Sequence, residues 1–242
     1  MNRNSKLNEI DLPEGYILGK NYTVLSRLGS GFESEVYLVQ ERFTGIERAA
    51  KIFYPHRNPS DKAAKFYAKK LHELHNCNLV IKYQLADTIR YKGHQLRFLI
   101  SEFVSGVALS KFIAGQPGKR LQSFQAVHLL YALAKGIEEI HTLRQYHGDL
   151  HSENVIVQRH GLGFELKVLD MYHWGKFSRA NVEHDVCCLI QIFHEALGGS
   201  KTYAKHPPHI KEICCGLKKT LISKKFRNAS QLRAYLENMQ WP

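Results

Sequence analysis

The sequence lacks the features that would direct it into a membrane or a secretory pathway. No uncharged apolar run approaches the 18 residues that a membrane-spanning helix needs. The first residues, MNRNSKLNEIDLPEG, contain no apolar core of the kind that a signal peptide has. We therefore expect no transmembrane segment and a cytoplasmic location.

Cysteine is present, but not in a pattern that forms a disulfide framework or a zinc site. The five cysteines include two adjacent pairs, Cys187-Cys188 and Cys214-Cys215, and no CxxC spacing occurs. Side chains of adjacent residues diverge, so we expect reduced thiols. The chain also lacks internal repeats, and its 44% hydrophobic and 23% charged residues exclude a disordered, collagen-like or coiled-coil protein.

Acidic residues are scarce relative to basic ones. The 22 aspartates and glutamates face 34 lysines and arginines, which gives a formal net charge of +12. This excess favours an acidic partner: a nucleotide, a nucleic acid, an anionic membrane surface or an acidic protein. Solvated lysine faces are common, however, and solubility alone also explains the charge. Nothing beyond charge indicates nucleic-acid binding.

The first half of the 242-residue chain predicts a small antiparallel sheet with one inserted helix. Runs of β-branched and aromatic residues between glycine-containing turns predict five strands, at Tyr22–Leu28, Val36–Val39, Arg48–Phe53, Val80–Ile89 and Leu96–Val104. From Asp61 the apolar period changes to 3.6, which predicts a helix between the third and fourth strands. Its apolar stripe, opposite the lysines, contains Ala64, Tyr67, Leu71 and Leu74.

The second half of the chain predicts mainly helices. Ser123 is a predicted N-cap, Asp185 is predicted to open a helix that ends at Gly198-Gly199, and a last helix follows Ser230. A sheet-rich portion followed by a helical one indicates an α+β fold with two lobes, divided near Ser105-Gly106.

Two features of the first half suit a phosphate group. Gly29 and Gly31, in GSGFESEV, leave backbone N–H groups open between two predicted strands. Lys51 lies in an otherwise apolar strand, and a buried ammonium needs an anion, which a phosphate would supply. Each also has an ordinary explanation: an unremarkable glycine turn, and an edge lysine that reaches solvent.

The most specific pattern is HGDLHSENVIV, followed by KVLD. Asp149 and Asn154 lie five residues apart on a polar loop that enters an apolar strand, and Asp170 ends the next strand. One carboxylate can accept a hydroxyl proton, while an amide oxygen and a second carboxylate can hold Mg²⁺ beside a phosphate substrate.

With these motifs in this order, the chain resembles the protein-kinase superfamily from about Tyr22 to Leu236. The resemblance implies one kinase-like domain over residues 1–242, with ATP and Mg²⁺ as cofactors. Its N-lobe, an antiparallel sheet with one helix, would span about 20–104, and its mainly helical C-lobe about 106–240. Residues 1–19 would be an N-terminal extension.

The resemblance assigns further residues one at a time. Asp149, Lys51 and His151 would be catalytic, and Asn154 and Asp170 would bind the metal. In the hinge-like segment LISEFVSG, Ser101 would be the gatekeeper and the backbone of Glu102 and Val104 would bind adenine. The remaining nucleotide contacts would come from Gly29, Gly31, Val36, Ala49, Lys51 and Ile156. Asp185 matches a buried aspartate that holds the catalytic loop; an ordinary N-cap is the alternative.

Several positions depart from the family pattern. Tyr67 occupies the place of the glutamate that pairs with the third-strand lysine, so Lys51 would pair with Glu73 or rely on Asp170 and phosphates. Met171 and Tyr172 replace the phenylalanine and glycine of DFG. Met171 can fill an apolar socket, and the missing glycine indicates a loop that does not flip.

The activation segment is also reduced. Only 14 residues separate Asp170 from Asp185, with no APE motif, and Gly148 replaces the arginine of HRD. His151 takes the place of a lysine, as in HGDLH-type bacterial small-molecule kinases, where it would stabilise transferred charge or brace the loop. We therefore expect activity without activating phosphorylation.

Three functions remain open. The favoured one is a minimal serine/threonine protein kinase with a protein substrate. The first alternative is a kinase of a small-molecule or lipid-linked sugar hydroxyl, favoured by the GDLHxxN loop. The second is a nucleotide-binding pseudokinase scaffold, against which the joint presence of Lys51, Asp149, Asn154 and Asp170 argues.

Overall fold

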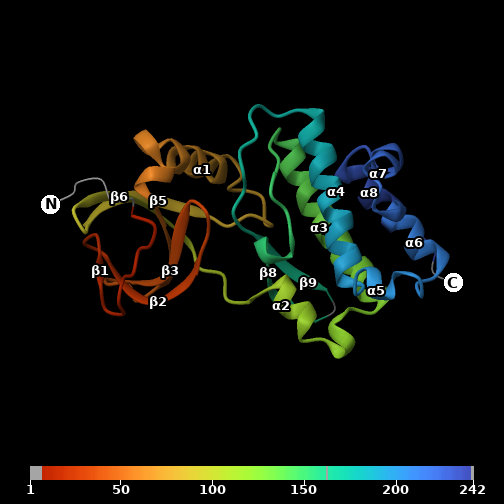
Figure 1. The fold of residues 1–242 in the computed structure, drawn as a ribbon, viewed down its shortest axis with the longest axis horizontal. Helices are drawn as coiled ribbons and strands as arrows, with labels where there is room; N and C mark the ends of the chain where they lie inside the picture. Colours follow the sequence, from red (N-terminus) through yellow and green to blue (C-terminus); the bar gives the residue numbers. More distant parts are fainter. Residues whose placement is uncertain (1–6, 162, 241–242) are drawn as a thin grey trace. The chain divides into compact units, whose positions relative to one another are not determined.

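The computed structural model describes residues 7–161 and 163–240, which form two compact units (Figure 1). Unit 1 contains the chain up to His75 together with Ile81–Val104. Unit 2 contains Asn76–Val80 and the chain from Ser105 onward. In the described residues, no helix is long and apolar enough to cross a membrane.

Unit 1 is built on a six-stranded antiparallel sheet in the order β1-β2-β3-β4-β6-β5. Its strands are β1 Ile17–Leu18, β2 Tyr22–Ser30, β3 Ser34–Glu41, β4 Glu47–Phe53, β5 Tyr83–Tyr91 and β6 His94–Glu102. The side chains alternate along each strand, so Tyr37 and Val39 of β3 and Ala50 and Ile52 of β4 bury on one face. This arrangement confirms the expected antiparallel meander and adds β1, which the sequence does not predict.

Residues before β1 pack into the same core. Ile10 is fully buried, and its N–H donates to Glu35 Oε1 at 2.7 Å. The Tyr37 hydroxyl donates to the Ile10 carbonyl, and the Tyr54 hydroxyl donates to Glu35 Oε1 at 2.9 Å. Arg27 Nε lies 3.2 Å from the same carboxylate. A charged side chain with no solvent exposure is thus fully surrounded by donors, as burial of a charge requires.

One helix, α1 (Lys62–Glu73), packs against β5 and β6, as the sequence predicts (Figure 1). Its buried stripe contains Ala64, Tyr67 and Leu71. Lys70, predicted on the polar face, is buried instead, with its ammonium 5.5 Å from the centre of the Phe66 ring. The aromatic face gives a buried cation a partner.

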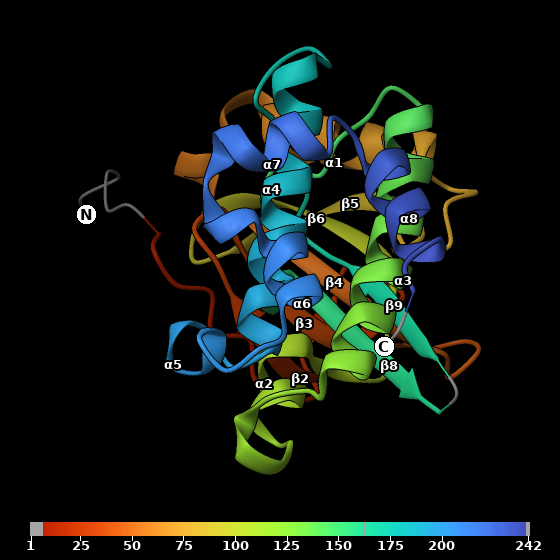
Figure 2. The same ribbon diagram turned by 90° about the vertical axis from the view of Figure 1, so that its right-hand side faces the viewer.

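Unit 2 is mainly helical, with a small sheet in the order β7-β8-β9. The elements are β7 Val107–Ala108, α2 Leu109–Ala114, α3 Ser123–Thr142, β8 Val155–His160, β9 Phe164–Val168, α4 Arg179–Ala196, α5 Ser200–Tyr203, α6 Pro208–Cys214, α7 Lys219–Lys225 and α8 Ala229–Glu237. α3 packs against α4 and α8, as Figure 2 shows. α3 buries several leucines and isoleucines completely, and α4 buries Val186, Leu189 and Phe193.

Three predicted helix starts are wrong. Gln122, not Ser123, caps α3, in a capping box with Gln125. Ser178 caps α4, so Asp185 lies inside that helix and does not open it. Asn228 caps α8 by accepting the N–H of Gln231 at 2.9 Å. In each case a side-chain oxygen one to several residues earlier satisfies the first free N–H groups.

Asn76–Val80, within the segment between α1 and β5, belongs to unit 2. Gly136 of α3 makes this possible, because a Cβ at that position would lie 2.5 Å from the Leu79 side chain. Val80 forms an isolated parallel bridge with Val168, and Leu79 accepts the Val168 N–H at 2.8 Å. The predicted strand Val80–Ile89 therefore begins too early, since β5 starts at Tyr83.

Candidate active site

A buried carboxylate holds the loop that carries the predicted catalytic residues. Asp185 of α4 has no solvent exposure, and it accepts the N–H of His147 at 2.7 Å and that of Gly148 at 2.9 Å. His141 Nε2 lies 3.0 Å from the same carboxylate. Burial alone would raise the pKa of Asp185, but the hydrogen bond from His141, the nearby imidazole of His147 and the hydrogen bond from the Gly148 N–H outweigh it and lower that pKa.

Asp149 and Asn154 are joined directly. Asn154 ends a short 3₁₀ turn before β8, and its Nδ2 donates to the Asp149 carbonyl at 2.8 Å and lies 3.4 Å from Asp149 Oδ2. The amide nitrogen is thus committed to the loop, which leaves Asn154 Oδ1 as its ligand atom. The Asp149 carboxylate is 55% exposed, and His151 Nε2 lies 3.8 Å from it.

Asp170 follows β9 and is held between two hydrogen bonds to the same loop. Its backbone has φ +52°, in the left-handed region that a residue with a side chain rarely adopts. On one side the Leu169 N–H donates to the Asn154 carbonyl at 2.8 Å, and on the other the Tyr172 N–H donates to the His147 carbonyl at 2.8 Å. These bonds impose the unusual conformation.

The donor set of this loop fits a hard divalent cation. Asn154 offers an amide oxygen and Asp170 a carboxylate, which are the ligand types that Mg²⁺ takes together with water and phosphate oxygens. Within residues 7–161 and 163–240, no group of three or more His, Cys, Asp or Glu side chains forms a metal cage. A magnesium ion that shares its shell with a substrate phosphate does not need one.

In unit 1, the strand register brings four predicted nucleotide contacts to one face of the sheet. Val36 lies opposite Lys51, and Ala49 lies opposite Ser101. Directly opposed residues point to the same face, and so do residues two apart on one strand. Val36, Ala49 and Lys51 are half-buried there, whereas the other face carries the fully buried core.

Lys51 meets an aromatic ring at the position where the family has a glutamate. Its ammonium lies 4.4 Å from the centre of the Tyr67 ring and 5.8 Å from that of Phe53. Glu73, the alternative partner suggested by the sequence, is an exposed residue at the end of α1. The face of an aromatic ring attracts an ammonium group in this position.

The remaining predicted contacts lie at strand ends. A Cβ at Gly29 or Gly31 would meet nothing within 4 Å, so packing within the chain does not require glycine there. The Glu102 N–H donates to the Lys82 carbonyl at 2.9 Å, and the Glu102 carbonyl accepts the Ser101 hydroxyl at 3.4 Å. In unit 2, Ile156 of β8 is half-buried and pairs with Ala108.

Residues that the sequence did not single out complete the loop. His141, predicted as part of an apolar stripe, is a partner of Asp185. Trp174 Nε1 donates to the Gly148 carbonyl at 2.7 Å, and the Trp174 N–H donates to the Tyr146 hydroxyl at 2.7 Å. The available signal was a tryptophan four residues after Asp170 in a segment too short for a peptide-docking loop.

Comparison with known proteins identifies the family. The model of the protein kinase domain matches residues 22–202, well over half of the chain. The chain belongs to the protein kinase family, which confirms the expected kinase-like fold.

Curated relatives are serine/threonine and dual-specificity kinases. The chain is 27% identical over 158 residues to serine/threonine-protein kinase pkn2 of Myxococcus xanthus, a match that covers 65% of this chain and 18% of that protein. It is 22% identical over 157 residues to drp72 of Corynebacterium efficiens, with 64% and 29% covered. Human dual specificity testis-specific protein kinase 1 is 26% identical over 148 residues, with 60% and 22% covered. The chain thus spans less than a third of these relatives.

A solved structure shows the same fold. The kinase domain of Mycobacterium tuberculosis PknI aligns with a TM-score of 0.67 at 17% sequence identity, covering 94% of this chain and 99% of that one. At this identity the likeness establishes the fold alone.

Replacing Asp185 tests whether the buried carboxylate holds the loop. Asp185→Asn places an NH₂ group against N–H donors, so we expect a loss of about 3 kcal/mol in the free energy of unfolding, measured by urea denaturation. Because the folded pKa is lowered, the carboxylate stabilises the protein above its ordinary pKa of about 3.9. The difference between wild type and variant should therefore shrink as the pH falls below that value.

Glu183→Gln is the matched control on the same helix. Glu183 pairs at 2.7 Å with Arg179, whose side chain is 76% exposed, so its loss should cost less than about 1 kcal/mol. Equal stability of Asp185→Asn and wild type would contradict the anchoring role.

Proposed function

We propose that this chain is an ATP- and Mg²⁺-dependent kinase that phosphorylates serine or threonine in protein substrates. The observation that carries the proposal is the linkage of Asp149, Asn154 and Asp170 through the hydrogen bonds of one loop. The serine/threonine specificity printed for pkn2 and drp72 supports the choice of acceptor. The five free cysteines agree with a reducing, cytoplasmic setting.

Each residue of this loop has a distinct role. The exposed Asp149 carboxylate orients the acceptor hydroxyl and takes its proton late in the transfer. Asn154 Oδ1 and the Asp170 carboxylate would hold Mg²⁺, which when bound neutralises phosphate charge. His151, 3.8 Å from Asp149, would stabilise the transferred charge or brace the loop.

In unit 1, Gly29 and Gly31 would let phosphates approach the backbone, and Lys51 would hold them by charge. The base contacts proposed for unit 1 are Val36 and Ala49, and the one proposed for unit 2 is Ile156. Ser101 would be the gatekeeper, and the Glu102 carbonyl and the Val104 backbone would bind adenine.

A small-molecule or lipid-linked sugar hydroxyl is the second candidate acceptor. The observation that favours it is the start of α4 at Arg179, which leaves only residues 171–178 between Asp170 and that helix. So short a segment offers little surface for an extended peptide. A pseudokinase scaffold would need neither a proton acceptor nor paired metal ligands.

Labelled ATP distinguishes these functions. The purified chain is incubated with γ-labelled ATP alone, then with cell protein and with a small-metabolite fraction. Label in a protein band supports the proposed function, and label in metabolites supports the second candidate. ATP binding without transfer to any fraction would identify a pseudokinase.

Asp149→Asn tests the proton acceptor. Asparagine keeps the size and some hydrogen bonding of the side chain but cannot take the proton. We expect retained ATP affinity and a loss of about 10²-fold or more in single-turnover transfer. Thermal unfolding of the same sample provides the control, because an exposed side chain should change Tm little. Near-normal turnover would refute the mechanism, and a joint loss of rate and Tm would assign Asp149 to bracing the loop.

Asp170→Ala tests the metal ligand. Removing one of two protein ligands should abolish the Mg²⁺-dependent part of nucleotide affinity while the fold remains intact. The measurement is a titration of ATP with and without Mg²⁺ by calorimetry, with Glu183→Gln as the acidic-residue control. An unchanged Mg-ATP titration would contradict the assignment.

A further inference from the structure

Four hydrogen bonds join the segment after Asp170 to the start of the catalytic loop. Two are the Trp174 bonds described above, to the Gly148 carbonyl and the Tyr146 hydroxyl. The Tyr146 hydroxyl in turn donates to the Gly175 carbonyl at 2.8 Å. The fourth is the bond from the Tyr172 N–H to the His147 carbonyl at 2.8 Å. We call residues 172–175, fixed in this way, the docked segment.

Gly148 and Trp174 fit one another. Gly148 has φ +83°, and a Cβ on it would lie 2.9 Å from Trp174 Cδ1 and 3.0 Å from the Tyr172 carbonyl oxygen. A side chain at position 148 would therefore be strained and would collide with the docked segment. The residue that replaces the arginine of HRD is the residue that leaves room for this tryptophan.

We propose that Trp174 is a positioning residue that fixes the docked segment, and through it Asp170, without a phosphate group. The inference rests on the proposed function and gives the regulation of that site. Asp170 lies two residues before Tyr172, and its left-handed backbone is maintained by a hydrogen bond on each side. If the docked segment detaches, the hydrogen bond from the Tyr172 N–H is lost, and the Asp170 backbone is fixed on one side only. We call the four hydrogen bonds of the docked segment the latch. They form when the chain folds and need no phosphate group.

Hydrogen exchange tests the latch without reference to activity. Trp174→Phe removes the indole N–H and keeps a ring, Trp174→Ala removes both, and Tyr146→Phe removes the shared hydroxyl. We expect at least about 10-fold faster exchange at the Tyr172 amide in Trp174→Ala, with smaller effects in the two Phe variants. Amides of α4 should be unchanged. Phe124→Ala, which removes an exposed aromatic side chain of unit 2, is the control. Unchanged exchange at Tyr172 in all three variants would overturn the proposal.

Kinetics then test the consequence for the site. We expect Trp174→Ala to lower kcat at least about 10-fold with little change in KM for ATP, and to raise the Mg²⁺ concentration needed for half-maximal rate. Wild-type protein from a phosphatase-rich host should be fully active, and strong activation by an upstream kinase would overturn the proposal. An inactive wild type with intact latch effects on exchange would count against the proposed function alone.

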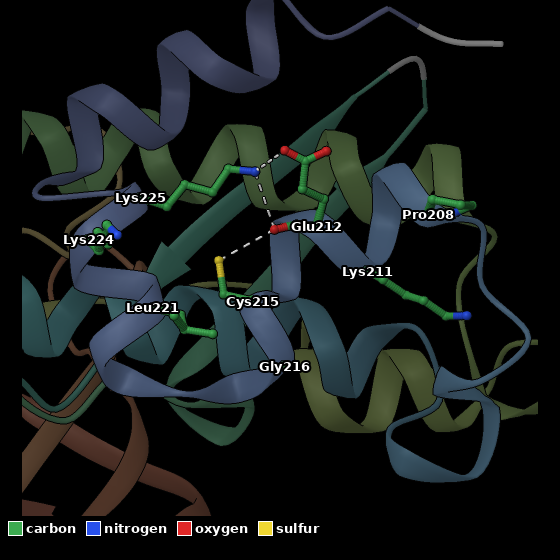
Figure 3. Close-up of a pocket in the computed structure, with 8 residues that line it drawn as sticks. All are labelled: Pro208, Lys211, Glu212, Cys215, Gly216, Leu221, Lys224 and Lys225. Atoms are coloured by element: carbon green, nitrogen blue, oxygen red, sulfur yellow. Dashed lines mark hydrogen bonds and ion pairs between the residues drawn. The ribbon is translucent and has the colours of Figure 1, made fainter.

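A second surface of unit 2 has no role in this mechanism. α6, the 3₁₀ turn Cys215–Leu217 and α7 surround an open hollow of about 880 Å³ (Figure 3). Figure 3 shows Lys211 and Lys224 on opposite sides of the hollow, with Cys215 and Leu221 between them. Leu221 is 46% exposed. Lys225 is fixed at the hollow by its ion pair with Glu212 at 2.6 Å.

Three lysines line this hollow, Lys211, Lys224 and Lys225, and they lie in a basic stretch of the sequence. Between Lys201 and Arg227 the sequence has eight lysines and arginines and a single acidic residue, Glu212. The three lysines and one glutamate of the lining give a net charge of 3 − 1 = +2 around Leu221, with Lys225 paired to Glu212 and Lys211 donating to the Ala204 carbonyl at 2.7 Å. This combination is complementary to a chain that carries both carboxylates and one aliphatic side chain.

We propose that the hollow binds an acidic peptide segment of a partner protein, with an aliphatic side chain on Leu221. Nucleic acid would favour arginine and aromatic side chains for stacking, whereas the residues that line the hollow include neither. Peptide binding here is independent of ATP and of the catalytic loop.

Fluorescence anisotropy tests the hollow with a labelled twelve-residue peptide of Glu and Asp around one Leu. We expect the double variant Lys211→Glu/Lys224→Glu to weaken binding at least about 10-fold and Leu221→Ser to weaken it several-fold. Lys65→Glu/Lys69→Glu, which makes the same charge change on exposed residues of α1, should have little effect. Equal loss in this control, equal binding of a peptide with Ser in place of Leu, or preferred binding of single-stranded DNA or phosphatidylserine vesicles would overturn the proposal.

Discussion

The geometry of the candidate active site depends on one carboxylate that water does not reach. Asp185 accepts N–H groups from His147 and Gly148, so two consecutive peptide groups are fixed in orientation. The His147 carbonyl then accepts the Tyr172 N–H, and the Gly148 carbonyl accepts the Trp174 indole. Because the carboxylate is buried, these hydrogen bonds are strong. Losing one destabilises the folded state, since no water can replace the missing partner. The Asp149 carboxylate can stay exposed to solvent, because Asp185 fixes the backbone of the two residues before it.

The core of unit 1 is also organised around a buried carboxylate. Glu35 is fully buried and satisfied by Ile10, Tyr54 and Arg27, so the chain before β1 is attached to the sheet through a charge. The hydroxyls of Tyr37 and Tyr54 donate to this carboxylate, and burial is the largest cause of their raised pKa values, with that of Tyr54 at about 12. In both units, a buried acid organises segments that hydrophobic contacts alone would leave without a fixed orientation.

What the sequence predicts well is what lies close together along the chain. The strands before and after Gly31 and the helix α1 with Tyr67 on its buried stripe follow from local patterns, whereas Gly29, expected between two strands, lies inside β2. What it predicts poorly depends on partners far away in the sequence. The sequence places His141 on an apolar stripe, because its partner Asp185 lies 44 residues later. The role of Trp174 depends on the hydrogen bond from its indole to the Gly148 carbonyl. The predicted helix starts are wrong where the side chain of an earlier residue caps the helix.

The family relationship and the charge of the chain are carried by different residues. The kinase-domain match ends at residue 202, whereas the lysines around the hollow of α6 and α7 follow that point. The likeness to other kinases therefore accounts for the loop, the metal ligands and the sheet, but not for the positive charge. The lysines are not needed to build the catalytic loop, because that loop is held by Asp185, His141 and Trp174. Three of them, Lys211, Lys224 and Lys225, line one hollow, and this is the surface to which the proposed acidic peptide would bind.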